Sequence, residues 1–174
     1  MNEPARSFIN HLQTLSETNR GALAHLKRSL GFAPGAYPPA FPYVERFVGA
    51  DRHADDPWRQ ALYLTAGLYA RHPMHQEGLR LAAALGKLGH ERDSASVEQR
   101  FIAMLAADPA SLSPLLRQVV SLLASDSLAC DYVALLENLA VWLKPHASES
   151  RDRLSQQWAR DFYRHYEPQT ETKS

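Results

Sequence analysis

Apolar residues recur at three- and four-residue intervals along almost the whole chain, and this spacing constrains its fold more than any other feature. The first stretch carries apolar side chains at Phe8, Ile9, Leu12 and Leu15, and the next at Leu23, Leu26 and Leu30. Because an α-helix has 3.6 residues per turn, side chains at these intervals share one face. No segment alternates convincingly as a strand would, so the sequence predicts an all-α protein.

Capping residues and prolines divide the chain into helices. The first two helices are predicted at 4–15 and 19–31, and a proline-rich stretch after them can hold at most one short helix, around 43–48. Asp56 and Pro57 then form a cap and a first turn, and Pro73 ends that helix at His72. Further helices are predicted at 75–88, after a capping box of Ser96 and Gln99, from Ser113-Pro114, from Asp131 to Lys144, and at 148–166.

These helices predict two small helical-bundle lobes with roughly eight or more helices and no sheet. We expect an amino-terminal lobe at 1–92, which includes the proline-rich segment 31–56 as an ordered element because it is rich in Phe, Tyr and Val. The carboxy-terminal lobe is expected at 93–166, with the polar stretch "GHERDSAS" as the boundary, and 167–174 as a disordered tail with nothing to bury.

Composition limits the classes of function. The chain has 174 residues, 45% of them hydrophobic, which suffices for one sizeable core or two small ones. Lys plus Arg and Asp plus Glu balance at 19 each, so attraction to a polyanion must come from local patches. Cys130 is the single cysteine, which excludes an internal disulfide. The start of the chain lacks a signal-like apolar core and no run is long enough to span a membrane, so we expect a soluble cytoplasmic protein.

Two helices carry basic residues at regular spacing. In "NRGALAHLKRSLG", Arg20 and Lys27 lie two turns apart beside the apolar stripe, and Arg28 lies farther out. In the last helix Arg153, Arg160 and Arg164 fall on one side, and Leu154, Trp158, Phe162 and Tyr166 on the other. Such stripes serve either to keep a surface helix in water or to contact a phosphate backbone. Asp152 and Asp161 flank the second stripe and favour the first interpretation.

Patterns that indicate catalysis or metal binding are absent or incomplete. His72 and His75 have a ligand-like spacing in "HPMH", but Pro73 breaks the helix and no Cys or acidic cluster completes a site. The chain has no phosphate-cradling glycine loop and no nucleophile elbow. Its three tryptophans lie on apolar stripes and are expected in the core rather than as base-stacking platforms. We therefore expect no enzyme activity, no metal and no cofactor.

Five segments taken together resemble the CasB family, the small subunit of the type I-E CRISPR Cascade complex. They stand in the family's order and spacing and span nearly the whole chain: "RGALAHLKRSLG" (20–31), "LYLTAGLYARHP" (62–73), "SVEQRFIAMLAAD" (96–108), "LSPLLRQVVSLL" (112–123) and "WARDFY" (158–163).

The resemblance implies a non-catalytic subunit of a crRNA-guided surveillance complex in antiviral defence. Family members are all-helical and two-lobed, and their basic surfaces contact crRNA and target DNA and stabilise the R-loop without reading sequence, which base pairing with the guide supplies. The implied partners are crRNA, target DNA, the other Cascade subunits and a second copy of the chain, with no membrane. Carried over position by position, the implied nucleic-acid contacts are Arg20, Lys27, Arg28, Arg100, Arg117, Arg153 and Arg160.

The chain also departs from the family pattern, and two alternatives stay open. Gln99, Ser121, Ser125 and Ser127 stand where basic residues are common in the family, which implies a weaker positive patch on the carboxy-terminal lobe. Arg100 lies two residues from Glu98 and could be ion-paired with it. From another class of function, a helical module that binds only proteins would use the arginines for solubility.

Overall fold

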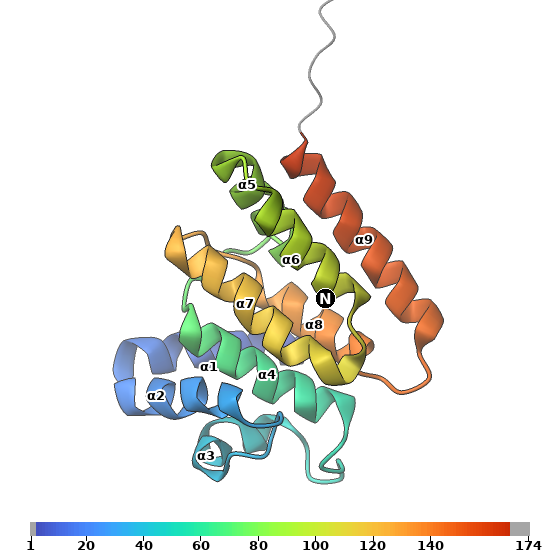
Figure 1. The fold of residues 1–174 in the computed structure, drawn as a ribbon. Helices are drawn as coiled ribbons and strands as arrows, with labels where there is room; N and C mark the ends of the chain where they lie inside the picture. The colour runs from blue at the N-terminus through green and yellow to red at the C-terminus, as the bar shows by residue number, and fades with distance from the viewer. Residues whose placement is uncertain (1–2, 168–174) are drawn as a thin grey trace, which may run out of the picture.

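The computed structural model describes residues 3–167, and α-helices make up most of them (Figure 1). The nine α-helices in this range are α1 (Glu3–Thr18), α2 (Arg20–Arg28), α3 (Phe41–Val44), α4 (Pro57–Arg71), α5 (Leu81–Arg92), α6 (Ala95–Ala106), α7 (Leu112–Ser125), α8 (Tyr132–Trp142) and α9 (Ser148–Tyr166). Short 3-10 helices are η1 (Ser29–Gly31), η2 (Pro38–Ala40), η3 (Glu45–Phe47) and η4 (Pro109–Ser111). Within 3–167 no strand forms, which confirms the all-α prediction.

Side-chain caps start three of these helices where the sequence predicted a start. The Asn19 side chain accepts a hydrogen bond from the Ala22 amide at 3.0 Å and opens α2. Asp56 accepts from the Trp58 amide at 2.9 Å, and Asp131 accepts from the Ala134 amide at 3.0 Å. Each cap satisfies a backbone N–H that the first helical turn leaves without a partner.

The fifth helix differs from its predicted range of 75–88, since α5 begins at Leu81 and continues to Arg92. Residues 73–80 form a connection instead, and backbone hydrogen bonds join it to the segment before α8. The Cys130 amide donates to the Met74 carbonyl at 3.2 Å, and the Asp131 amide donates to the Leu79 carbonyl at 2.6 Å. These contacts are long-range, so the apolar spacing of 75–88 could not reveal them.

The start of α6 also differs from its prediction. Ser94, rather than Ser96, is the N-cap, and its hydroxyl accepts from the Ser96 amide at 3.3 Å. Asp93 ends α5 in the left-handed conformation, with a φ of 49°. The "GHERDSAS" stretch is therefore the last turn of α5, a two-residue connection of Asp93 and Ser94, and the start of α6.

α4 lies at the centre of the fold. Every residue from 61 to 70 is buried, and the helix packs against α1, α2, α7 and α8. One continuous cluster of buried apolar residues extends from α1 to α9. The lobe boundary near residue 92 remains a prediction, and α5 packs along α9 across it (Figure 1).

The proline-rich segment follows the surface of α4 and contributes Ala40, Val44 and Val48 to the core. In place of one helix around 43–48 it forms η2, α3 and η3 in succession. At the carboxy end of the chain, residues 168–174, which include most of the predicted tail, lie outside the described residues. Among the residues that are described, no helix is both long and apolar enough to cross a membrane.

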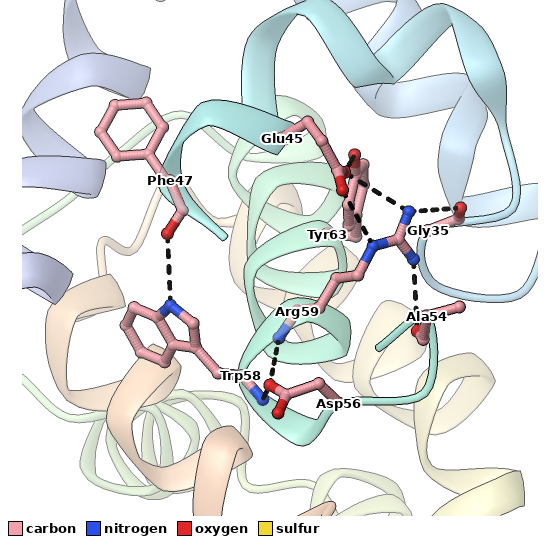
Figure 2. Close-up of polar contacts among 8 residues, drawn as sticks. All are labelled: Gly35, Glu45, Phe47, Ala54, Asp56, Trp58, Arg59 and Tyr63. Carbon is pink, nitrogen blue, oxygen red and sulfur yellow. Dashed lines mark hydrogen bonds and ion pairs between the residues drawn. The ribbon is translucent and has the colours of Figure 1, made fainter. Parts of the chain in front are cut away.

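Arg59 of α4 holds this segment in place (Figure 2). Its guanidinium donates to the carbonyls of Ala54 and Gly35, each at 3.3 Å, and to the Glu45 carboxylate at 3.3 Å. The Tyr63 hydroxyl donates to the same carboxylate. Burial alone would raise the pKa of Glu45, but the hydrogen bonds from Tyr63 and Arg59 lower that pKa below its usual value. One buried cation thus joins both ends of a segment with little regular structure of its own.

Candidate nucleic-acid interface

All seven basic residues that the sequence singled out are exposed on the surface: Arg20, Lys27, Arg28, Arg100, Arg117, Arg153 and Arg160. Within residues 3–167, none of them forms an ion pair with an acidic side chain. Among the described residues, the arginines that do pair with acids are Arg6, Arg52, Arg59, Arg80 and Arg92. The predicted contact residues are therefore available to an external anion.

α2 buries its apolar side and exposes its cations. Ala22 and Leu26 are fully buried, whereas Lys27 and Arg28 at the end of the helix are exposed. Gly67 of α4 lets α2 and η1 pack closely on it, because a Cβ there would lie 3.2 Å from the Leu26 carbonyl oxygen and 2.6 Å from the side chain of Leu30. The predicted amphipathic character of this helix is confirmed.

A surface groove of about 760 Å³ brings Arg100 of α6 and Arg117 of α7 together with a third arginine, Arg71, from the end of α4. α7 packs against both α4 and α6 and supplies most of the lining residues (Figure 1). The full lining is Leu30, Gly31, Arg71, Arg100, Pro114, Arg117, Gln118, Ser121, Leu122 and Ser125. Leu30 and Gly31 belong to η1, which directly follows α2, but none of the three basic residues of α2 lines the groove.

Sequence reasoning missed Arg71. It ends a helix whose preceding ten residues are all buried, so no stripe of basic residues marks it. Only its position in the sequence could indicate that its side chain reaches solvent. The residue before His72-Pro73 is at the helix end, where side chains reach solvent.

Glu98 does not neutralise Arg100, although the two residues are neighbours in sequence. The Glu98 carboxylate accepts a hydrogen bond from the Tyr163 hydroxyl at 2.9 Å. Burial, together with this carboxylate, raises the pKa of Tyr163 to about 12. Glu98 therefore ties α6 to α9, and Arg100 contributes to the groove lining without it.

The basic residues of α9 form a separate surface. Trp158 and Phe162 are buried and Arg153, Arg160 and Arg164 are exposed, as the spacing predicted. Asp161 is engaged by Arg80 at 3.2 Å, so this acid does not pair with the stripe. Figure 1 shows α9 and α2 at opposite edges of the molecule. The predicted residues thus lie in three places: on α2, in the groove formed with α6 and α7, and on α9.

His72 and His75 form hydrogen bonds within the fold, and Cys130 is buried. The buried His72 ring donates from Nε2 to the Leu128 carbonyl, and His75 Nδ1 accepts from the Tyr132 amide at 3.1 Å. Burial raises the pKa of the Cys130 thiol to about 12, which keeps it protonated. In the part of the chain that the structure describes, no three His, Cys, Asp or Glu side chains are arranged to hold a metal ion.

Comparison with known proteins identifies the family. The family model for CRISPR-associated protein Cse2 matches residues 22–163. The chain belongs to the Cse2 family. It is 39% identical over 167 residues to the CRISPR-associated protein Cse2 of Thermus thermophilus, covering 92% of this chain and 90% of that one. This confirms the resemblance found in the five sequence segments.

Solved structures of Cse2-family proteins share the fold. The crystal structure of CasB from Thermus thermophilus matches with a TM-score of 0.75 at 39% identity, covering 93% of this chain and 99% of that chain. A chain of a CRISPR RNA-guided surveillance complex matches with a TM-score of 0.78 at 22% identity, covering 95% of this chain and 94% of that chain. The second likeness bears on the fold alone.

Proposed function

We propose that this Cse2-family chain is the non-catalytic small subunit of a type I-E, crRNA-guided Cascade surveillance complex in the cytoplasm. In this role it binds the phosphate backbone of crRNA and target DNA without reading sequence and stabilises the R-loop in antiviral defence. The other Cascade subunits and a second copy of the chain are its proposed protein partners. Membership of the Cse2 family and the fold shared with a chain of a surveillance complex support this proposal.

One observation carries the nucleic-acid part of the proposal. The seven predicted basic residues are exposed, and within residues 3–167 no acidic side chain pairs with them, in a chain whose total charge is zero. Five acids of the described residues are engaged with other arginines, as Asp126 is with Arg92 at 2.7 Å. These five acids are therefore not available to neutralise the seven basic residues.

The mechanism is electrostatic retention of a backbone. A lysine or arginine that contacts a phosphate releases a condensed counterion, so each contact adds affinity that falls as salt rises. Such contacts position the duplex or strand but carry no sequence information. Base pairing with the guide would supply the choice of target.

Assembly is the first test. Co-expression with the other Cascade subunits and crRNA should yield a complex that contains this chain, with stoichiometry from native mass spectrometry. Failure to enter any such complex would overturn the proposed function.

DNA binding by that complex is the second test. Changing Arg20, Lys27 and Arg28 together to Glu should weaken target binding and flatten its dependence on salt by about one unit of slope per lost phosphate contact. Lys87→Glu is the control for a charge reversal elsewhere, because Lys87 is exposed on α5 and outside the proposed set. Equal salt slopes for the wild type and the triple variant would favour the alternative module that binds only proteins.

A further inference from the structure

Arg71 occupies the groove in a fixed orientation. It is the last residue of α4, and its guanidinium donates from Nε to the hydroxyl of Ser121 on α7. That hydroxyl in turn donates to the backbone carbonyl of Arg117 at 2.6 Å. We propose that Arg71 is a phosphate contact of the groove, alongside Arg100 and Arg117, and that Ser121 positions it. This inference rests on the nucleic-acid binding proposed above.

The hydrogen bond to Ser121 leaves most of the Arg71 guanidinium available. An arginine has five N–H donors in a planar fork, and the bond to Ser121 uses only the one on Nε. Among residues 3–167, no carboxylate pairs with Arg71. Its terminal N–H groups can therefore bind two oxygens of one phosphate at once.

The lining of the groove indicates which part of a ligand it binds. None of its lining residues is acidic and none is aromatic, so nothing neutralises the three guanidiniums and nothing offers a stacking surface for a base. Gln118 and Ser125 add neutral polar groups, and Leu30, Pro114 and Leu122 add apolar wall. Apolar walls have a low dielectric constant, which strengthens the electrostatic field of the arginines inside the groove. The chemistry that fits is a phosphodiester backbone.

Arg71 is held in place before a ligand binds, whereas Arg100 and Arg117 are not. Arg100 and Arg117 are exposed and make no side-chain hydrogen bond among the described residues, so both lose rotamer freedom when they bind a phosphate. Arg71 is half-buried and already held by Ser121, so it loses less. Removal of the Ser121 hydroxyl should therefore weaken binding although it removes no charge.

The experiment uses the isolated full-length chain, because one chain supplies every residue of the groove. Fluorescence anisotropy follows the binding of a fluorescein-labelled single-stranded DNA between about 0.1 M and about 1 M salt. Arg71→Gln should lower the salt slope by about 0.7, which corresponds to about fivefold weaker binding at the low-salt end and little difference at the high-salt end. Arg6→Gln is the matched control, since Arg6 is also half-buried and bonded, to Glu77 at 2.8 Å, but lies outside the groove.

Ser121 variants separate positioning from charge. Ser121→Ala should weaken binding by a similar factor at every salt concentration and keep the wild-type slope, and Ser121→Thr should restore affinity because it keeps a hydroxyl. Circular dichroism of each variant verifies that the chain is folded.

The inference is overturned if the wild-type chain shows no salt-dependent binding, or if Arg71→Gln behaves like Arg6→Gln while Arg117→Gln flattens the slope. It is also overturned if Ser121→Ala matches the wild type. None of these results bears on co-purification with the Cascade subunits, so the proposed function can stand when this inference fails.

Discussion

Gly86 lies on α5 in close contact with the backbone of α9. A Cβ at this position would lie 2.2 Å from the carbonyl oxygen of Phe162 and 3.1 Å from its carbonyl carbon. Because these atoms belong to the backbone of a helix, no change of rotamer can move them away. Gly86→Ala should therefore push α9 outward by about 1 Å, against the close packing typical of protein interiors.

The expected cost follows from two opposing effects. Alanine in place of a glycine inside a helix gains about 1 kcal/mol through the unfolded state and helix propensity. Overpacking a well-packed core costs about 1 to 3 kcal/mol, and a backbone neighbour that cannot repack places this case near 3. We therefore expect a net loss of about 2 kcal/mol in the free energy of unfolding, or about 4 to 8 °C in melting temperature for a chain of this size.

The assay is thermal unfolding followed by circular dichroism at 222 nm, with Gly21→Ala as the control. Gly21 is an exposed residue of α2, and a Cβ there would lie 3.5 Å from the Asn19 side chain, which is an ordinary contact. This control should be as stable as the wild type or more stable by about 0.5 kcal/mol. If Gly86→Ala is as stable as Gly21→Ala, the reasoning about the contact of α5 with α9 is wrong.

Three further predictions concern stability and reactivity. Arg59→Leu should lower the free energy of unfolding by about 2 kcal/mol, because it leaves the carbonyls of Gly35 and Ala54 without their donor; urea denaturation measures this, and an unchanged midpoint would contradict it. Cys130 should not react with Ellman's reagent at pH 8 in the native protein, since burial raises the pKa of its thiol to about 12; it should react fully in guanidinium chloride, and rapid native labelling would refute its burial. Burial, with the nearby Arg46 charge, lowers the pKa of His11 in the folded state, although the hydrogen bond to the Tyr43 carbonyl opposes the shift. As the pH falls through the range between the unfolded and folded pKa values of His11, the folded state binds fewer protons than the unfolded state, so protonation of His11 favours unfolding. His11 therefore leaves the free energy of unfolding undiminished above about pH 6.5 and lowers it as the pH falls below that value. The melting temperature should therefore drop less between pH 8 and pH 5.5 in His11→Gln than in the wild type, and equal drops would contradict the assignment.

The helices that could be read from sequence are those whose signals are local. Asp56 and Asp131 cap the helices that they were predicted to cap, because a cap involves a side chain and an amide only two or three residues away. The start of α5 was misplaced because backbone hydrogen bonds to residues 130 and 131 hold the segment before Leu81 in a non-helical conformation. Nothing in the spacing of Leu79 and Leu81 reports a partner fifty residues away.

In the candidate interface, too, local features could be read from the sequence and long-range contacts could not. Spacing placed Arg20, Lys27 and Arg28 outside the buried stripe of their helix, and the structure confirms their exposure. The sequence left open whether Arg100 forms an ion pair with Glu98. Only the packing of α6 on α9 shows that Tyr163 is the partner of Glu98. Contact of any of these residues with nucleic acid remains a proposal.

The sequence by itself determined the helical class of this protein and the face on which each basic residue lies, because the period of a helix is a local property of the backbone. Only the tertiary structure decided which cations share a surface. Arg71, Arg100 and Arg117 come from three helices and meet in one groove because α7 packs against both α4 and α6, while the arginines of α9 lie at another edge. Helix packing depends on contacts between residues far apart in the chain, which no local pattern records.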